Sequence, residues 1–559
     1  MKLYKTLPLI ALCATAYAPT AASAAPTIKS YFEFKQPPGP VLIDGSSDAY
    51  GASAPVSYAS GPVTLSFEGI SQYDLATVRR PNFIPPDTMG AVGRTQYFET
   101  ANGAYAVFDK NTGAQLSLVS DTAFWAAAGQ TGANGDSRVM YNAAASRWIA
   151  ISFGANTKDL QIAISDTDNA LGTWQSTKFE GFAGFGFGAT ADYPTLALDR
   201  NAVYIGTNNF APAISGGTNS FRGTTLNVIP LDSLFGAGAP TVGGMKQFVT
   251  PFTGGASDID RGFALQGVNS TDASSSGTVV AASLFAFDSL GFKVNNLTST
   301  SATGSTVDPA TYLGQAAFDS PGPGRQPSVG NVNNQRVIST LDERISSSVY
   351  QVNGRIYMVN TVNDVADGVD ESRVRYTVLD ANTFAIIDEG NIGQAGYDYY
   401  QGSIAVNEYG EVVIGYNRSG LDAATGKISF MGQMFRTGYD GKLVSISSEL
   451  LLKESLTDDY HNGSLFGGNA TGRQRWGDYS QVSVDPSNAH NFYLIGQFAR
   501  EYNLPQFGHP NGTGGSRWGT WISVLSTPVP EPQTWAMMVF GFGLMGYAMR
   551  RRRYTASFA

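Results

Sequence analysis

The sequence has little cysteine, histidine and charge: one cysteine, three histidines and 14% charged residues in 559. The single cysteine, Cys13, excludes an intramolecular disulfide and a cysteine-ligated metal or iron–sulfur site. His461, His490 and His509 lack the paired spacing of a zinc site. The net charge is -9, and no Lys/Arg cluster occurs in the body of the chain. Nucleic acid is therefore not expected as a partner, because phosphate binding depends on clustered cations.

Turn-forming and apolar residues are abundant instead. The chain has 64 glycines and 26 prolines, with 42% hydrophobic and 12% aromatic residues. So much apolar material predicts a large packed core and excludes a disordered chain. Helical bundles and coiled coils are rich in Ala, Glu, Lys, Leu and Arg, so this composition favours an all-β fold.

The N-terminus has the pattern of a secretory signal peptide over residues 1–24. A basic start (Lys2, Lys5) precedes an apolar stretch from Leu7 to Ala18, and small residues end at Ala24. We expect signal peptidase to cleave after Ala24, which leaves an exported mature chain without cysteine.

The C-terminus has the pattern of a membrane anchor. Thr534–Met549 is an uncharged run of 16 residues, just short of the usual length of a spanning helix. Four arginines follow the run and predict a cytoplasmic end: Arg550, Arg551, Arg552 and Arg553. The hydropathy alone would also fit a plain C-terminal anchor helix.

A short motif, Pro530-Glu531-Pro532, stands just before this run. Pro-Glu-Pro, an apolar helix and a terminal arginine cluster, in that order, resemble the PEP-CTERM sorting signal of Gram-negative bacteria that make exopolysaccharide. The resemblance implies that an exosortase recognises Pro530, Glu531 and Pro532 and removes the helix and arginines. It further implies a precursor held transiently in the inner membrane and a mature form at the cell surface or in the extracellular matrix.

The body between these signals contains a repeated pattern of a polar turn with Asp, a strand, a second turn and a strand with an aromatic residue. Asp136 and Asp192 are 56 residues apart, as are Trp148 and Tyr204, and a third clear copy starts at Asp478. Weaker copies begin at residues 87, 347 and 402. Period-2 alternation between Gly, Asn and Asp turns is typical of antiparallel strands joined by hairpins.

A unit of 50 to 60 residues with several short strands is typical of a β-propeller blade. We therefore predict an all-β propeller of about seven four-stranded blades over residues 77–526, preceded by an arm at 25–76 and followed by the sorting signal at 527–559. A solenoid or a pair of β-sandwiches remains the alternative. Residues 210–337 show little pattern.

Several stretches of the body resemble a group of secreted bacterial proteins with a sialidase-like propeller: residues 86–93, 341–344, 403–407 and 475–480. In addition, Ser165-Asp166-Thr167-Asp168 followed by Gly172-Thr173-Trp174 is similar to the Asp-box of sialidase propellers. An Asp-box is a hairpin staple, so it predicts fold rather than activity.

Signatures of catalysis are missing from the sequence. The Arg-Ile-Pro motif of sialidases is absent, its nearest string being Arg344-Ile345-Ser346, and no Gly-x-Ser-x-Gly elbow occurs. Paired glycosidase carboxylates are defined by distances in space and cannot be assigned from sequence. No catalytic residue can be named, and an uncatalogued hydrolase or lyase stays open.

Two groups of residues are candidates for binding. Carboxylates at the same position of three repeats could hold calcium near a propeller axis, or each could cap its own turn: Asp136, Asp192 and Asp478. A cluster of arginines and aromatics could bind a glycan, or its rings could pack between blades: Arg473, Arg475, Trp476 and Tyr479.

These patterns predict an exported, exosortase-sorted propeller of the cell surface or matrix. It is expected to be non-enzymatic and to interact with exopolysaccharide or other surface proteins. The alternative is an exported carbohydrate-active enzyme on the same scaffold, because propellers carry both kinds of function.

Overall fold

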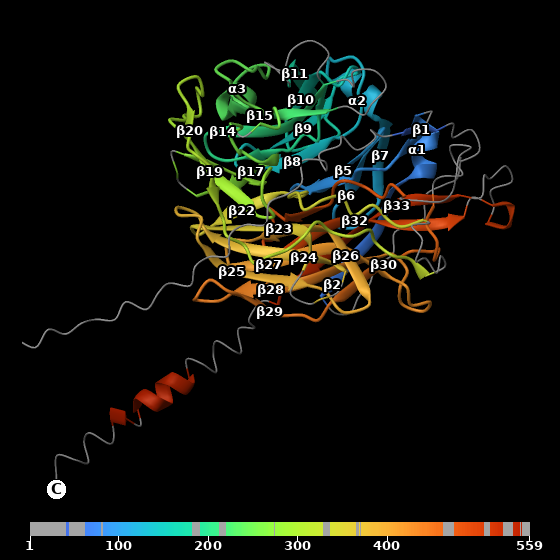
Figure 1. Cartoon of the computed structure of the whole chain (residues 1–559), viewed down its shortest axis with the longest axis vertical. Coiled ribbons are helices and arrows are strands. Elements are labelled where there is room, and N and C mark those ends of the chain that lie inside the picture. Colours follow the sequence, from blue (N-terminus) through green and yellow to red (C-terminus); the bar gives the residue numbers. More distant parts are fainter. Residues whose placement is uncertain are drawn as a thin grey trace, which may run out of the picture.

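A computed structural model describes most of the body and part of the C-terminal tail (Figure 1). The described residues are 41–43, 62–79, 82–181, 190–211, 220–255, 257–272, 274, 276–327, 336–364, 368, 370–461, 474–502, 504–507, 515–528, 540–547 and 549–550. The predicted signal peptide with Ala24, and Pro530, Glu531 and Pro532, lie outside this part of the chain.

Three sheets follow one another in the N-terminal half of the body. The first contains β4 (Met89–Val92), β5 (Gln96–Ala101), β6 (Ala104–Asp109) and β7 (Gln115–Ser120). The second contains β8 (Arg138–Asn142), β9 (Arg147–Phe153), β10 (Asp159–Ser165) and β11 (Trp174–Glu180). The third contains β12 (Thr190–Asp192), β13 (Ala197–Leu198), β14 (Ala202–Ala211), β15 (Ser220–Pro230) and β16 (Lys246–Pro251).

A nine-stranded sheet comes next. Its first part contains β17 (Phe263–Ser270), β18 (Gly277–Ala282), β19 (Ser289–Asn295), β20 (Thr306–Val307) and β21 (Thr311–Tyr312). Its second part contains β22 (Val349–Val352), β23 (Arg355–Asn363), β24 (Ser372–Asp380) and β25 (Ile386–Ile392).

Two further sheets complete the body, and a small ribbon lies beside them. One sheet contains β26 (Tyr397–Val406), β27 (Glu411–Gly420), β28 (Ser429–Thr437), β29 (Leu443–Ser445) and β30 (Leu450–Glu454). The other contains β31 (Gln481–Val484), β32 (Asn491–Tyr502), β33 (Ser516–Ser526) and β2 (Val63–Ser71). The ribbon pairs β1 (Val41–Ile43) with β3 (Asn82–Ile84).

Helices are few and short in the described chain: α1 (Gln72–Val78), α2 (Asp121–Ala127), α3 (Leu231–Phe235) and the 3₁₀ turn η3 (Pro505–Phe507). In the tail, residues 540–547 and 549–550 are helical, and the rest of the predicted anchor 534–549 lies outside the described residues. No helix of the described chain is long and apolar enough to cross a membrane. The transmembrane helix therefore stays a prediction.

The sheets form a β-propeller, as the sequence predicts. Figure 1 shows them following one another around the molecule in the order of the colours. Apolar side chains of neighbouring sheets pack face to face, for example Ile149 and Ile162 of the second sheet against Val203 and Ile205 of the third. Each sheet therefore buries both of its faces, which accounts for the large apolar and aromatic content.

The predicted number of seven separate four-stranded blades is wrong. Five sheets stand alone as blades of four or five strands, and the remaining strands belong to the nine-stranded sheet or to the β1–β3 ribbon. Within that sheet, β17 and β22 pair in parallel, with Val268 opposite Val349. This pairing merges two antiparallel groups of strands, and a repeat in the sequence cannot reveal it because it depends on how two neighbouring inner strands approach.

The last sheet closes the ring with a strand from the beginning of the chain. β2, which the sequence assigned to the arm at 25–76, pairs antiparallel with β33, so residues 63–71 lie beside 516–526. Tyr97 of the first sheet stacks on Tyr493 of the last, with ring centroids 5.7 Å apart. The ring therefore joins residues more than 400 positions apart in sequence.

The Asp-box-like segment is a hairpin staple, as predicted. The Asp166 carboxylate accepts hydrogen bonds from Thr173 Oγ1 (2.5 Å) and Gln175 Nε2 (2.8 Å). These two bonds lower the pKa of Asp166. Trp174, the first residue of β11, packs beneath the turn in a cluster with Trp148. The segment stabilises the connection between β10 and β11.

Candidate functional site: an aspartate and arginine cluster at the propeller axis

The three repeated aspartates occupy equivalent places in their sheets. Asp136 and Asp478 lie just before the inner strands β8 and β31, and Asp192 ends β12. A fourth carboxylate, Asp87, lies in the same place before β4. Asp87, Asp136 and Tyr193 have positive φ angles of 44°, 53° and 53°, so the chain bends sharply at the same point of three sheets.

Hydrogen bonds tie these carboxylates together across sheets. The Asp87 carboxylate accepts from the Asp478 backbone N–H and from Asn102 Nδ2, both at 2.7 Å. The Oδ1 atom of the same asparagine accepts from the Asp136 backbone N–H at 2.8 Å. The first, second and last sheets therefore meet at Asn102 and Asp87.

Three arginines from different sheets lie among the aspartates. Arg475 Nη2 is 3.3 Å from Asp478 Oδ1. Arg344 donates two hydrogen bonds to Asp342, of 2.6 and 2.7 Å. Arg138, the first residue of β8, donates to the backbone oxygen of Pro194 at 2.8 Å. We call Asp87, Asp136, Asp192, Asp478, Arg138, Arg344, Arg475, Tyr193 and Tyr479 the axial cluster.

Two tyrosine rings lie between the charged groups. The rings of Tyr193 and Tyr479 have centroids 4.9 Å apart. The Arg138 guanidinium lies 3.7 Å from the Tyr479 centroid, and that of Arg344 lies 4.3 Å from the Tyr193 centroid. Residues of the second, third and last sheets can touch one another only at the centre of the ring, which places the cluster on the propeller axis.

Burial changes the acidity of the carboxylates. Burial, and then the neighbouring Asp478 carboxylate, raise the pKa of Asp87 to about 7. Burial also raises the pKa of Asp136 well above its usual value, and Asp192 and Asp87 raise it further. Because carboxylates this close repel one another when ionised, the group holds protons at a pH where exposed aspartates have lost them.

Two guanidinium nitrogens of the cluster have no hydrogen-bond partner among the described residues. They are Nη2 of Arg138 and Nη1 of Arg344. The two residues are only 2% and 4% exposed. Buried donors normally have an acceptor, so these two nitrogens are unsatisfied hydrogen-bond donors of the cluster.

The three aspartates that the sequence suggested as calcium ligands lie among the arginines and tyrosines of the axial cluster. Among the residues that the structure describes, no three Asp, Glu, His or Cys side chains converge in an arrangement that could hold a metal ion. Asp192 does cap its own turn, because its Oδ1 accepts from the Tyr193 backbone N–H at 2.9 Å. Asp87, in contrast, accepts from a different repeat, so simple turn capping does not describe the whole cluster.

The predicted glycan-binding residues lie in the interior rather than on an open loop. Trp476 and Tyr479 are fully buried, and Trp476 Nε1 donates to Asn417 Oδ1 at 3.1 Å. Arg475 is half-buried in the axial cluster, and Arg473 lies outside the described residues. The two rings therefore pack against neighbouring sheets and have no face open to solvent.

Sequence reasoning named Arg475 and Tyr479 as candidate binding residues, but it did not bring Arg138 and Arg344 to this site. Arg344 drew notice only as the nearest string to a sialidase motif, and Arg138 only as part of a repeat. Their positions differ from one repeat to the next, so no spacing connects them. Asp87 had a usable signal, since it starts one of the weaker repeats.

Residues 528–553 match the PEP-CTERM protein-sorting motif, as the sequence predicts. The chain is therefore an exported protein that an exosortase sorts from a membrane-anchored precursor. No curated protein matches the chain.

Solved structures with a similar arrangement are distant. A protein of unknown function from Dyadobacter fermentans is 9% identical, with 79% of this chain and 94% of that chain covered and a TM-score of 0.34. The GH93 alpha-L-arabinofuranosidase of Fusarium graminearum is 10% identical, with 82% and 98% covered and a TM-score of 0.35. The Trypanosoma rangeli sialidase is 10% identical, with 67% and 52% covered and a TM-score of 0.30. Similarity at this level does not indicate which ligand the chain binds or which reaction it catalyses.

Proposed function

We propose that the protein is a non-enzymatic propeller of the cell surface or extracellular matrix that binds a sugar unit of exopolysaccharide at the axial cluster. The observation that carries the proposal is the pair of buried, unpartnered guanidinium nitrogens of Arg138 and Arg344 beside carboxylates and tyrosine rings.

The chemistry of the cluster suits a sugar. Sugar hydroxyls both donate and accept hydrogen bonds, so they can bind guanidinium donors and carboxylate acceptors at the same time. Half-buried Asp192 and Arg475 form the exposed side of the cluster, through which a ligand would make its first contact. An exported protein sorted by an exosortase would meet such polymers outside the cell.

A second candidate function is an exported carbohydrate-active enzyme. It is favoured by the raised pKa of Asp87, about 7, next to other carboxylates. A carboxyl group that stays protonated near neutral pH can act as a general acid, while an ionised neighbour acts as base or nucleophile. This candidate needs a bond-breaking step, whereas the first needs only affinity.

A polysaccharide array, read once for binding and once for released oligosaccharides, tests the proposal. We expect binding without product. Arg344→Gln removes a charged donor from the cluster and should weaken binding at least tenfold, since a charge-assisted hydrogen bond contributes roughly 1.5 to 3 kcal/mol.

The matched control is Arg418→Gln, because Arg418 pairs with Glu449 at 2.6 Å in a different sheet. Its affinity should equal that of the unchanged protein. Released oligosaccharide would favour the enzyme instead, and equal binding by both variants would remove the axial cluster from the proposal.

A further inference from the structure

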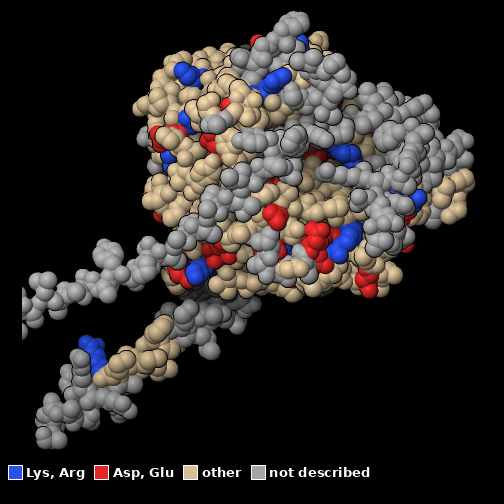
Figure 2. All heavy atoms as spheres, viewed as in Figure 1, with Lys and Arg blue, Asp and Glu red and all other residues tan. Residues whose placement is uncertain are grey.

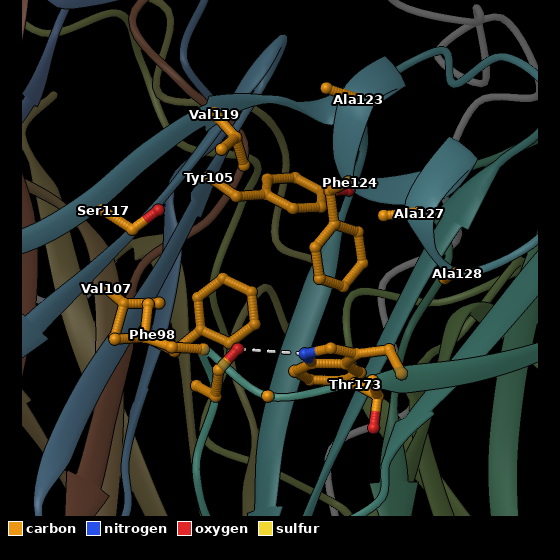
Figure 3. A pocket seen from close by; sticks show the side chains of 14 residues that line it. Phe98, Tyr105, Val107, Ser117, Val119, Ala123, Phe124, Ala127, Ala128 and Thr173 are labelled. Atoms are coloured by element: carbon orange, nitrogen blue, oxygen red, sulfur yellow. Dashed lines mark hydrogen bonds between the residues drawn. The ribbon is translucent and has the colours of Figure 1, made fainter.

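A cavity of about 300 Å³ lies away from the axial cluster, between the first two sheets (Figure 3). Its walls come from β5, β6 and β7, from helix α2, and from the hairpin that precedes β11. These elements include the outermost strands of both sheets, so the cavity belongs to the outer side of the propeller. It is independent of the proposed function.

Apolar atoms make up most of the cavity wall, and Ser117 and Thr173 are its polar side chains apart from the aromatic rings. None of the described residues that line it is charged. The polar atoms of its large rings already have partners within the protein: Trp174 Nε1 donates to the Ala170 backbone oxygen at 2.9 Å, and Tyr105 OH accepts from Trp125 Nε1 at 2.9 Å. The cavity therefore offers a ligand apolar contact and little hydrogen bonding.

Four aromatic rings surround this space with their edges and faces turned toward one another (Figure 3). Phe124 and Trp174 have centroids 5.1 Å apart and planes at 71°, and Phe98 and Trp174 are 5.7 Å apart at 70°. Tyr105 and Phe124 are 4.9 Å apart at 66°. Aromatic pairs prefer such edge-to-face contacts, so a further ring could enter the same pattern.

Small side chains keep one side of the cavity open. Ala123 and Ala127 lie one turn apart on α2, and both are exposed. Leu171, which is 46% exposed, lines the cavity from the hairpin. A methyl group on α2 leaves room where a larger side chain would fill the opening.

We propose that this aromatic pocket (Phe98, Tyr105, Phe124, Trp174, Ala123 and Ala127) binds a neutral, planar molecule of one or two fused rings. A dry cavity of about 150 Å³ lined by apolar residues holds benzene, so twice that volume accommodates a bicyclic ring. Charged ligands are disfavoured, because the wall offers no partner for a desolvated charge.

Calorimetric titration of the purified full-length protein with indole tests the proposal. We expect saturable binding with a Kd of about 0.1 to 1 mM, as befits a small ligand held by apolar contact alone. Ala127→Phe places a ring at the opening and should weaken indole binding at least tenfold.

The matched control is Ala126→Phe, because Ala126 is exposed on the same helix and does not line the cavity. This variant should bind indole as the unchanged protein does, and the melting temperature of both variants should show that each is folded. A lack of saturable indole binding by the unchanged protein, or equal loss in both variants, would overturn the proposal.

Discussion

Glu99 shows how a single buried acid can make the stability of the whole chain depend on pH. The side chain lies on β5 and is completely buried, and it accepts hydrogen bonds from Thr520 Oγ1 (2.6 Å) and the Ile70 backbone N–H (2.9 Å). Burial outweighs these bonds and raises its pKa from 4.5 to about 7. The acid therefore keeps its proton longer in the folded chain than in the unfolded chain.

Between pH 4.5 and about 7 the folded state binds this proton and the unfolded state does not, so the free energy of unfolding should fall as pH rises. The loss from Glu99 over this window amounts to roughly 3 kcal/mol. In Glu99→Gln this contribution disappears, so the total fall in the free energy of unfolding between these two pH values becomes smaller by that amount and the slope against pH becomes shallower. Denaturant unfolding at several pH values measures the slope.

Glu454→Gln serves as the control, because Glu454 is a more exposed glutamate at the end of β30 and its side chain is 41% exposed. Its slope should match that of the unchanged protein. A Glu99→Gln slope that also matches would mean that Glu99 titrates as it does in the unfolded chain.

At this same scale, the sequence predicted part of the candidate site. The repeat placed Asp136, Asp192 and Asp478 at equivalent points, and the structure brings them together. The repeat gave no access to Arg138 and Arg344, because charges that complete a central site come from unlike positions in each sheet.

Close contact between two neighbouring sheets depends on a glycine of one sheet that faces an aromatic ring of the other. Gly496 on β32 lies against the ring of Phe430 on β28, and a Cβ atom at this glycine would overlap the ring. Phe430 is buried in the cluster between these two sheets. The ring of Phe430 therefore occupies the space that a side chain at position 496 would need.

Gly496→Ala should therefore destabilise the protein by roughly 1 to 3 kcal/mol, because extra volume in a packed core forces side chains and backbone to move. Gly304→Ala is the control, because a Cβ at Gly304 meets no atom within 4 Å. Thermal unfolding of both variants measures the effect. Equal melting temperatures would show that β28 and β32 can separate without cost.

Strands that begin a clear copy of the repeat were predictable from the sequence, whereas the strands of residues 210–337 were not. The copies that start at Asp136 and Asp478 lead into β8 and β31 as expected. Residues 210–337 show little pattern in the sequence, yet they include β15 to β21. Every residue of β18 is buried, so Gly, Val and Ala replace alternation and leave no period-2 signal.

The ring as a whole is held together where its first and last sheets meet. Lys110 follows β6, and its Nζ lies 2.7 Å from Asp485 Oδ1, just after β31. The two side chains are 6% and 3% exposed, so both charges depend on each other for compensation. Figure 2 shows charged side chains of both signs scattered over one face of the molecule, whereas this pair lies in the interior.

Lys110→Met keeps the length of the side chain and leaves Asp485 as a buried charge without its cation. We expect a loss of about 3 to 5 kcal/mol in the free energy of unfolding. Asp485→Asn added to this variant should recover part of the loss. Chemical denaturation measures each variant.

Lys178→Met is the control, because Lys178 and Asp159 are 53% and 31% exposed and such a pair contributes below about 1 kcal/mol. A loss in Lys110→Met no larger than in this control would show that the first and last sheets do not depend on the pair.

The propeller class was predictable from the repeated unit, but the number of separate blades and the role of the arm were not. A sequence repeat indicates which strands pair within one sheet. The parallel pair β17–β22 and the pairing of β2 with β33 join different parts of the chain, so no local sequence pattern predicts them.

The pairing of β2 with β33 also sets an order of events during export. Residues 63–71 cannot enter their sheet until residues 516–526, more than 400 positions later in the chain, are available to pair with them. Contacts between such distant segments form slowly, because a long loop must close first. Since β33 ends only two residues before the matched sorting motif at 528, the ring cannot close until nearly the whole chain that precedes this motif is available.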